Sequence, residues 1–247
     1  MRSFKSIIER YSQLYNSLRF IDFVKYNANK LSSKLLNPDA QLSYSQFGED
    51  LIIQTFFQSQ KSGTYIDVGC NEPINYSNTW KLYLSGWTGI AIDANPSLTE
   101  KFKKVRPLDT VVAKPISNKK QIIEFYFSKK SHLISGIGEK RDSPWSRTDE
   151  NCDVIECESE RLDNILLEHN IPSDFDFLNI DTEGNEKDIL ISLDLNKFKP
   201  KLICVEIHDF TISTSEKSDI EELLSSMGYY IVAFSKPSIF FARKSND

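Results

Sequence analysis

Short, continuous apolar runs recur along the chain, as is typical of strands that are buried on both faces of a parallel sheet. The first two runs cover residues 65–68 and 89–93, and a polar turn and a helix-length segment, 76–85, separate them. Gly86 stands directly after that segment, at a place where a glycine commonly ends a helix. The pattern therefore predicts one strand, helix, strand unit.

The same pattern extends along the rest of the chain and predicts an α/β, Rossmann-like domain. Further strands are expected at 110–116, 121–127, 154–157, 175–181, 202–208, 229–234 and 238–242. Further helices are expected at 45–59, 96–104, 159–168, 185–193 and 217–227. The last two strands are joined by a short turn, so we expect them to be antiparallel.

Composition limits the number of domains and the class of partner. With 247 residues, of which 40% are hydrophobic, the chain can bury one large core. We expect one α/β domain, residues 41–247, preceded by a basic amphipathic helical extension, residues 1–40. The formal net charge of -5 gives no reason to expect a nucleic acid as partner. Four cysteines show no metal-ligand spacing, and reduced thiols in a cytosolic protein are expected.

The extension differs in charge from the rest of the chain. Residues 1–36 carry about +5, which leaves about -10 for the remainder. Apolar residues recur at helical spacing, so residues 4–36 could lie on an anionic membrane surface. The alternative is packing on the domain or self-association with a second subunit. No apolar run is long enough to span a membrane, so we expect a cytoplasmic protein or one at the inner membrane surface.

Acidic residues stand at the carboxyl ends of the first two strands, where ligands bind in open α/β sheets. Asp67 and Gly69 belong to the first turn, and Asp93 closes the second strand. A carboxylate placed like Asp93 can accept hydrogen bonds from both hydroxyls of a ribose. A dinucleotide-binding turn would need glycines where this chain has Asn71 and Ile74, so a pyrophosphate cradle is not expected. S-adenosylmethionine, which has a ribose and an adenine but no phosphate, suits this turn better.

Three strings carry a family resemblance: Tyr65-Ile-Asp-Val-Gly-Cys-Asn-Glu-Pro73, Tyr76-Ser-Asn-Thr79 and Gly86-Trp-Thr-Gly-Ile-Ala-Ile-Asp-Ala-Asn-Pro96. Together they resemble the FkbM-type methyltransferases, a branch of the class I S-adenosylmethionine-dependent enzymes. Three further stretches agree with that family: Ser45-Gln-Phe-Gly-Glu-Asp50, Arg161-Leu-Asp163 and Asp176-Phe-Leu-Asn-Ile-Asp-Thr-Glu-Gly-Asn-Glu186. The resemblance covers about residues 43 to 210 and departs at Cys70, where the family more usually has alanine.

The resemblance implies a seven-stranded, mostly parallel sheet with helices on both faces and an antiparallel C-terminal strand. It also implies O-methylation of a hydroxyl on a small-molecule, sugar or glycan acceptor. The segment before the first strand commonly covers the cofactor in such enzymes, and the loop after the third strand commonly meets its adenine. The candidate cofactor contacts are Gln46, Glu49, Asp67, Gly69, Cys70, Asn71, Asn78, Asp93, Ala94, Ser117 and Asp181. For the segment before the first strand, helix capping by Ser45 is the alternative.

A second group of polar residues is expected at the carboxyl ends of two later strands. Asp181 and Glu183 follow one strand, and Glu206 and His208 follow its neighbour. Methyl transfer requires removal of a proton from the attacking oxygen, and His208, Asp181 or Glu183 could accept it. Alternatively, Asp181 and Glu206 could hold Mg²⁺, which lowers the pKa of the acceptor hydroxyl. Capping of helix 185–193 by Glu183 and Glu186, or a loop hydrogen bond by His208, remains the structural alternative.

The long polar stretch between residues 128 and 153 is a candidate acceptor lid, with His132, Arg141 and Trp145 as sugar contacts. A surface loop without such a role is the alternative. The runner-up function is a non-catalytic subunit that keeps the fold for binding or scaffolding. Such a subunit has no need of carboxylates at strand ends, which favours an enzyme.

Overall fold

The computed structural model describes residues 39–128, 135–137, 152–208 and 217–243, with the single positions 28, 31, 32, 35 and 37. Most of the predicted N-terminal extension and the proposed lid contacts His132, Arg141 and Trp145 lie outside the described residues. Within the described part of the chain, no helix is both long enough and apolar enough to cross a membrane.

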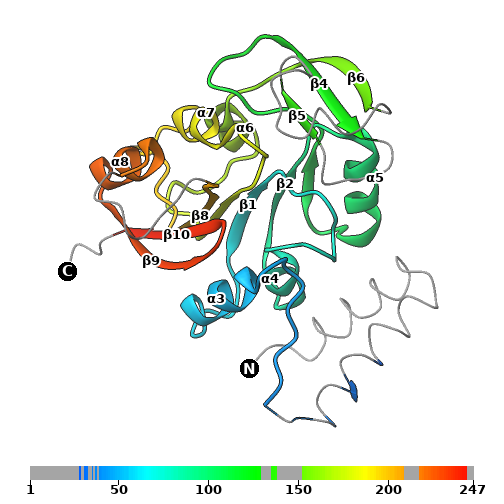
Figure 1. Cartoon of the computed structure of the whole chain (residues 1–247), viewed down its shortest axis with the longest axis vertical. Coiled ribbons are helices and arrows are strands. Elements are labelled where there is room, and N and C mark those ends of the chain that lie inside the picture. Colours follow the sequence, from blue (N-terminus) through cyan, green and yellow to red (C-terminus); the bar gives the residue numbers. More distant parts are fainter. Residues whose placement is uncertain are drawn as a thin grey trace.

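A seven-stranded sheet with the strand order β3-β2-β1-β7-β8-β10-β9 forms the centre of the molecule (Figure 1). Its strands are β1 (Thr64–Val68), β2 (Thr88–Ile92), β3 (Thr110–Val112), β7 (Phe177–Ile180), β8 (Leu202–Glu206), β9 (Tyr229–Ser235) and β10 (Ser238–Arg243). The five strands β3, β2, β1, β7 and β8 pair in parallel with their neighbours in this order. β10 is antiparallel to both β8 and β9, so the predicted antiparallel C-terminal strand is confirmed.

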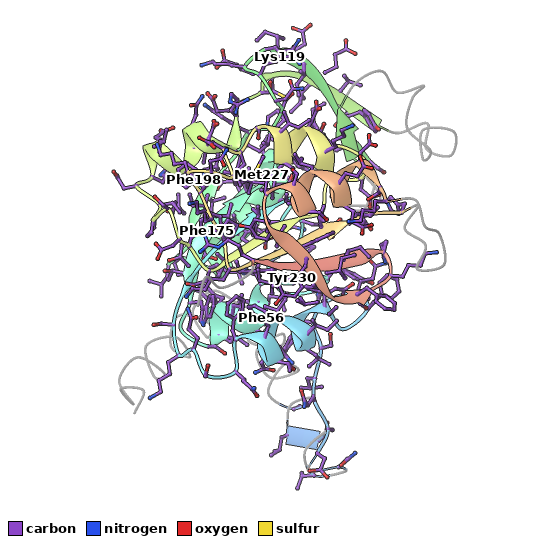
Figure 2. All side chains as sticks on the ribbon, turned by 90° about the vertical axis from the view of Figure 1, so that its left-hand side faces the viewer. Phe56, Lys119, Phe175, Phe198, Met227 and Tyr230 are labelled. Carbon is purple, nitrogen blue, oxygen red and sulfur yellow. The ribbon has the colours of Figure 1, made fainter. Side chains whose placement is uncertain are left out.

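Helices cover both faces of this sheet. One face packs against α6 (Leu162–Glu168), α7 (Glu186–Ile191) and α8 (Asp219–Ser226), and the other against α3 (Glu49–Phe56), α4 (Trp80–Leu84) and α5 (Pro96–Val105). Successive side chains of β1 point to opposite faces of the sheet. Ile66 therefore packs in the core on the face covered by α6, α7 and α8, and Tyr65 packs in the core on the opposite face. Figure 2 labels Tyr230, which is exposed on β9, and the buried Phe175 and Phe198, which belong to the core on the face covered by α6, α7 and α8. Burial of such side chains stabilises the fold by about 1.5–3 kcal/mol each.

Several elements are shorter than the apolar pattern predicts, and backbone conformation explains the difference. The helix expected at 76–85 begins only at Trp80, because Tyr76 has a positive φ of 57°. The strand expected at 110–116 ends at Val112, ahead of Pro115, which has no N–H to donate to a neighbouring strand. The helix expected at 45–59 begins at Glu49, since its N-cap is Gly48 in the left-handed conformation.

A second, three-stranded antiparallel sheet contains the two strands predicted at 121–127 and 154–157 and a third strand that was not predicted. It consists of β4 (Ile122–Ser128), β5 (Ser135–Ile137) and β6 (Cys152–Glu158), in the order β5-β4-β6. Figure 1 shows it at one end of the molecule, above α5 and beside α6 and α7. Phe125 of β4 lines a cavity at the carboxyl ends of the large sheet, so the small sheet forms part of the wall of that cavity.

Candidate active site

A cavity of about 980 Å³, counted out to its open mouth, lies at the carboxyl ends of β1, β2, β7 and β8. Most of the predicted site residues line it: Gln46, Asp67, Gly69, Cys70, Asn71, Asn78, Asp93, Ala94, Asp181, Glu183 and Glu206. Its position is the one at which open α/β sheets bind ligands. Residues far apart in sequence are therefore brought together as the strand pattern predicts.

Gly69 makes the first turn possible through a close approach between two backbones. Its φ is +76°, and its N–H donates to the carbonyl of Ile92 at 2.9 Å. A Cβ at this position would lie 1.7 Å from the carbonyl oxygen of Asp181. Only glycine allows the ends of β1 and β7 to come this close, which brings Asp181 to the cavity.

We expect Gly69→Ala to lower the free energy of unfolding by about 2–4 kcal/mol, because strain from the left-handed φ adds to overpacking. Urea unfolding followed by tryptophan fluorescence measures the change. Gly228→Ala is the matched control, since Gly228 has a φ of +85° and a Cβ added there would meet no atom within 4 Å. Equal losses in the two variants would show that the contact with Asp181 has no energetic role.

Asp93 has free acceptor capacity toward the cavity. Its Oδ2 accepts a hydrogen bond from the N–H of Asn71 at 3.1 Å, and its Oδ1 accepts one from the N–H of Asn95 at 2.7 Å. A carboxylate offers about four lone-pair sites, so each oxygen can accept one hydrogen bond more. Burial raises the pKa of Asp93 to about 6, and the two N–H groups oppose that shift. The carboxylate is thus the main form at neutral pH.

Asn71 gives an independent indication that a polar ligand belongs here. Its φ of 48° is left-handed, and its backbone N–H donates a hydrogen bond to Asp93. Its side-chain Oδ1 is buried and has no hydrogen-bond partner among the described residues. A buried acceptor without a donor costs about 1–3 kcal/mol, and a hydroxyl or amino group of a bound cofactor would remove that cost. Asp93 and Asn71 therefore fit a ribose-containing cofactor.

Asp67 differs from Asp93 in its hydrogen-bond donors. Both oxygens of Asp67 accept hydrogen bonds from side chains, whereas those of Asp93 accept them from backbone N–H groups. Thr79 donates to Oδ2, and the amide of Asn179 donates to Oδ1 at 2.8 Å. Asn78 in turn donates to Asn179 at 3.0 Å. Burial raises the pKa of Asp67. These bonds tie the first turn to β7, while a direct contact between Asp67 and the cofactor stays a prediction.

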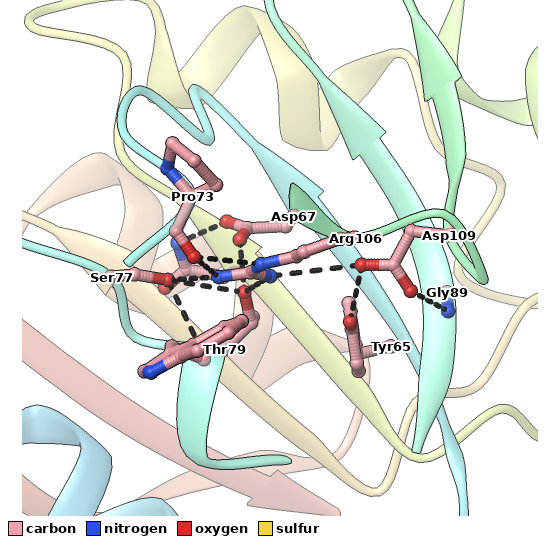
Figure 3. Close-up of polar contacts among 10 residues, drawn as sticks. Tyr65, Asp67, Pro73, Ser77, Thr79, Gly89, Arg106 and Asp109 are labelled. Carbon is pink, nitrogen blue, oxygen red and sulfur yellow. Dashed lines mark hydrogen bonds and ion pairs between the residues drawn. The ribbon is translucent and has the colours of Figure 1, made fainter. Parts of the chain in front are cut away.

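Arg106, which the sequence did not single out, holds the loop that follows β1 (Figure 3). Its side chain is fully buried and donates to the carbonyl of Pro73 from both Nε and Nη2, at 2.8 and 2.6 Å. It also donates to the hydroxyls of Ser77 and Thr79 and forms an ion pair with Asp109 at 3.7 Å. The guanidinium group of Arg106 therefore fixes the conformation of the loop that follows β1.

Asp181 and Glu206 form a carboxyl pair at the ends of β7 and β8. The two carboxyl groups lie within hydrogen-bonding reach of each other, so a proton on one of them can be shared with the other. Burial, followed by the charge of Glu206, raises the pKa of Asp181 well above its usual range, and burial raises the pKa of Glu206 to about 7. The pair can accept a proton from a ligand in the cavity, but the hydrogen bond between them gives no support to a Mg²⁺ ion bridging them.

Glu183 and His208 extend this cluster toward solvent. Nε2 of His208 lies 3.8 Å from Glu183 and 3.5 Å from Glu206. Glu183 has a φ of 57° and lines the cavity, while Glu186 accepts hydrogen bonds from Thr182 and Gly184 and so holds the turn. Glu186 thus holds the turn that precedes α7, while the N-cap residue Asn185 makes no side-chain capping hydrogen bond.

Three candidates lie outside the cavity lining: Glu49, Ser117 and His208. Glu49 is buried and accepts hydrogen bonds from the N–H of Phe47 and the hydroxyl of Ser238. Ser117 is buried and donates its N–H to Glu160. The lining near Ser117 consists instead of Lys114, Pro115 and Ile116. Cys70 does line the cavity, and its thiol packs against Ala91 and Phe102.

The strand order, the acid that closes β2 and the cavity at the strand ends are those of the class I S-adenosylmethionine-dependent methyltransferase fold. The model of the methyltransferase FkbM domain matches residues 67–231, and the chain belongs to this family. The family resemblance and the fold expected from the sequence are thereby confirmed.

Solved structures with low identity to this chain were also found. A TehB-like S-adenosylmethionine-dependent methyltransferase from Corynebacterium glutamicum is 11% identical, with a TM-score of 0.42 over 89% of this chain and 97% of that one. A protein from Sulfolobus solfataricus that is assigned to the type 11 methyltransferases is 9% identical, with a TM-score of 0.38 over 83% and 96% of the two chains. None of the curated proteins compared with the chain matches it significantly.

Proposed function

We propose that this protein transfers a methyl group from S-adenosylmethionine to a hydroxyl oxygen of a sugar, a glycan or a related natural product. The observation that carries the proposal is a shared cavity. Asp93, a hydrogen-bond acceptor suited to a ribose, and the carboxyl pair of Asp181 and Glu206, an acceptor suited to a proton, both line it. Membership of the FkbM methyltransferase family supports the reaction class.

Different residues of the cavity would bind the cofactor and accept the proton. Asp93 would bind the ribose hydroxyls, and the turn at Gly69 and Asn71 would hold the neighbouring part of the cofactor. When bound, S-adenosylmethionine supplies a methyl group on a positively charged sulfur. The carboxyl pair would take the proton that the acceptor hydroxyl loses as its oxygen forms the new bond. Closure of the cavity by residues 128–153 and membrane or subunit contact through residues 4–36 stay predictions.

Calorimetric titration of the full chain with S-adenosylmethionine and S-adenosylhomocysteine is the first test, and we expect saturable binding of both. An acceptor screen then follows, with transfer measured as release of S-adenosylhomocysteine in the presence of neutral sugars and glycans. Matched amine acceptors in the same screen separate O-methylation from N-methylation. Transfer to amines alone would overturn the hydroxyl assignment. Absence of binding by either ligand would favour the scaffold role.

A further inference from the structure

Three metal-ligating atoms from two strand ends converge beside the cavity. They belong to Glu183, Glu206 and His208, and each residue offers one ligand atom that lies within 4.8 Å of the other two. His208 is 3.8 Å from the oxygen of Glu183 and 3.5 Å from that of Glu206. Ligand atoms placed tetrahedrally at metal–ligand distances of about 2.0–2.1 Å are roughly 3.4 Å apart. The side chains therefore need only small rotations to meet one ion.

An unsatisfied oxygen lies within this cluster. Oε2 of Glu206 is buried and has no hydrogen-bond partner among the described residues, although the Glu206 side chain as a whole is 11% exposed. The Glu206 carboxyl group is hydrogen-bonded to Asp181, as ligating carboxylates usually are to an outer partner. A cation placed between Glu206 and His208 would give this oxygen its missing partner.

The charges around the cluster favour a cation as well. The groups that act most strongly on Asp181 and Glu206 are further carboxylates, from Glu183, Glu186 and Glu49. Among these groups no lysine or arginine offsets the negative charge. A protonated His208 would offset one unit of it at most, whereas a divalent ion would offset two.

We propose that Glu183, Glu206 and His208 bind one divalent transition-metal ion of the manganese, cobalt or zinc class. An imidazole ligand favours these ions over Mg²⁺ and Ca²⁺, which prefer oxygen ligands throughout. Three protein ligands, with His208 51% exposed, leave coordination positions open toward the mouth of the cavity. An acceptor hydroxyl bound there would lose its proton more readily. That catalytic role rests on the proposed function, whereas the binding of the ion does not.

The test uses the full chain, freed of metal with a chelator and titrated calorimetrically with MnCl₂, ZnCl₂ and MgCl₂ in separate experiments. We expect one site for Mn²⁺ and Zn²⁺ and at least tenfold weaker binding of Mg²⁺. His208→Gln and Glu183→Gln are each expected to weaken Mn²⁺ binding at least tenfold, since loss of an outer-shell partner alone typically costs about 10–100-fold. Quenching of the free Mn²⁺ electron paramagnetic resonance signal gives a second readout.

Glu168→Gln and His169→Gln are matched controls, because these residues form a second Glu–His pair at the end of α6. Binding unchanged in the site variants, or lost equally in the controls, would identify an adventitious ion and overturn the proposal. Absence of any saturable binding would overturn it too and would leave protonated His208 as the partner of Glu206. Binding of S-adenosylmethionine is measured separately in chelator, so failure of the metal site and failure of the proposed function are distinguishable.

Discussion

Asp93→Asn is expected to weaken the binding of S-adenosylmethionine at least a hundredfold. Two hydrogen bonds from ribose hydroxyls to a carboxylate would contribute about 1.5–3 kcal/mol each. An amide cannot replace this carboxylate, because one of its two ends is a donor. That end would face either the N–H of Asn71 or Asn95, or a ribose hydroxyl. Calorimetric titration of the variant and the wild type measures the change.

Asp194→Asn is the matched control for this experiment. Asp194 accepts a hydrogen bond from the N–H two residues later, as Asp93 does, but it is exposed and does not line the cavity. We expect its substitution to leave the affinity for S-adenosylmethionine unchanged. If both variants bind the cofactor as the wild type does, Asp93 is not the ribose acceptor.

The pH dependence of binding provides a further readout of Asp93. Its pKa of about 6 means that the carboxylate is present above that pH and is lost as pH falls through it. Affinity for the cofactor should therefore be constant near about pH 8 and fall toward about pH 5, and this fall should be absent in Asp93→Asn. A raised pKa also means that the stabilising contribution of Asp93 is present at low pH and lost as pH rises through about 6. At neutral pH the loss of this buried charge in the variant should offset part of the stability that is lost when the amide leaves one backbone N–H without an acceptor.

The parallel strands and the residues at their ends could be predicted because their physical signals are local. A strand buried on both faces is largely apolar, and residues 65–68 and 89–93 are apolar apart from one acid in each. Sequence order then places Asp67 and Asp93 at one edge of the sheet. The convergence of Asp181 and Glu206 was predicted in the same way, because β7 and β8 are neighbours in the sheet.

The contacts beneath the site could not be predicted from local pattern. Arg106 follows an amphipathic helix, where a basic residue is usually solvated at the helix C-terminus. Only the tertiary structure places Trp80, Tyr83 and Phe102 around it and buries its charge. The sequence gives a weak indication of the role of Asn179, because it is the polar residue within an otherwise apolar strand. The structure then places it opposite Asp67 in the register of β1 and β7.

Replacement of Arg106 by methionine is expected to lower the free energy of unfolding by about 3–5 kcal/mol, the usual effect of removing one partner from a buried ion pair. The guanidinium is fully buried, so its loss would leave the Asp109 carboxylate without its cation and Pro73 and Ser77 without a donor. Urea unfolding followed by the fluorescence of the two buried tryptophans, Trp80 and Trp87, measures the change.

Lys103→Met on the same helix is the control, since Lys103 is 54% exposed and its solvent-screened ion pair with Glu100 should contribute little to stability. The effect of Arg106→Met should also depend on pH. Burial raises the pKa of Asp109 to about 6 and also raises that of Asp67, and the charge of Arg106 opposes both shifts. Without Arg106 both pKa values rise further, so both groups can be protonated more readily at about pH 5 than at about pH 8. The loss of stability should therefore grow as pH rises, whereas a loss caused only by missing volume would be independent of pH.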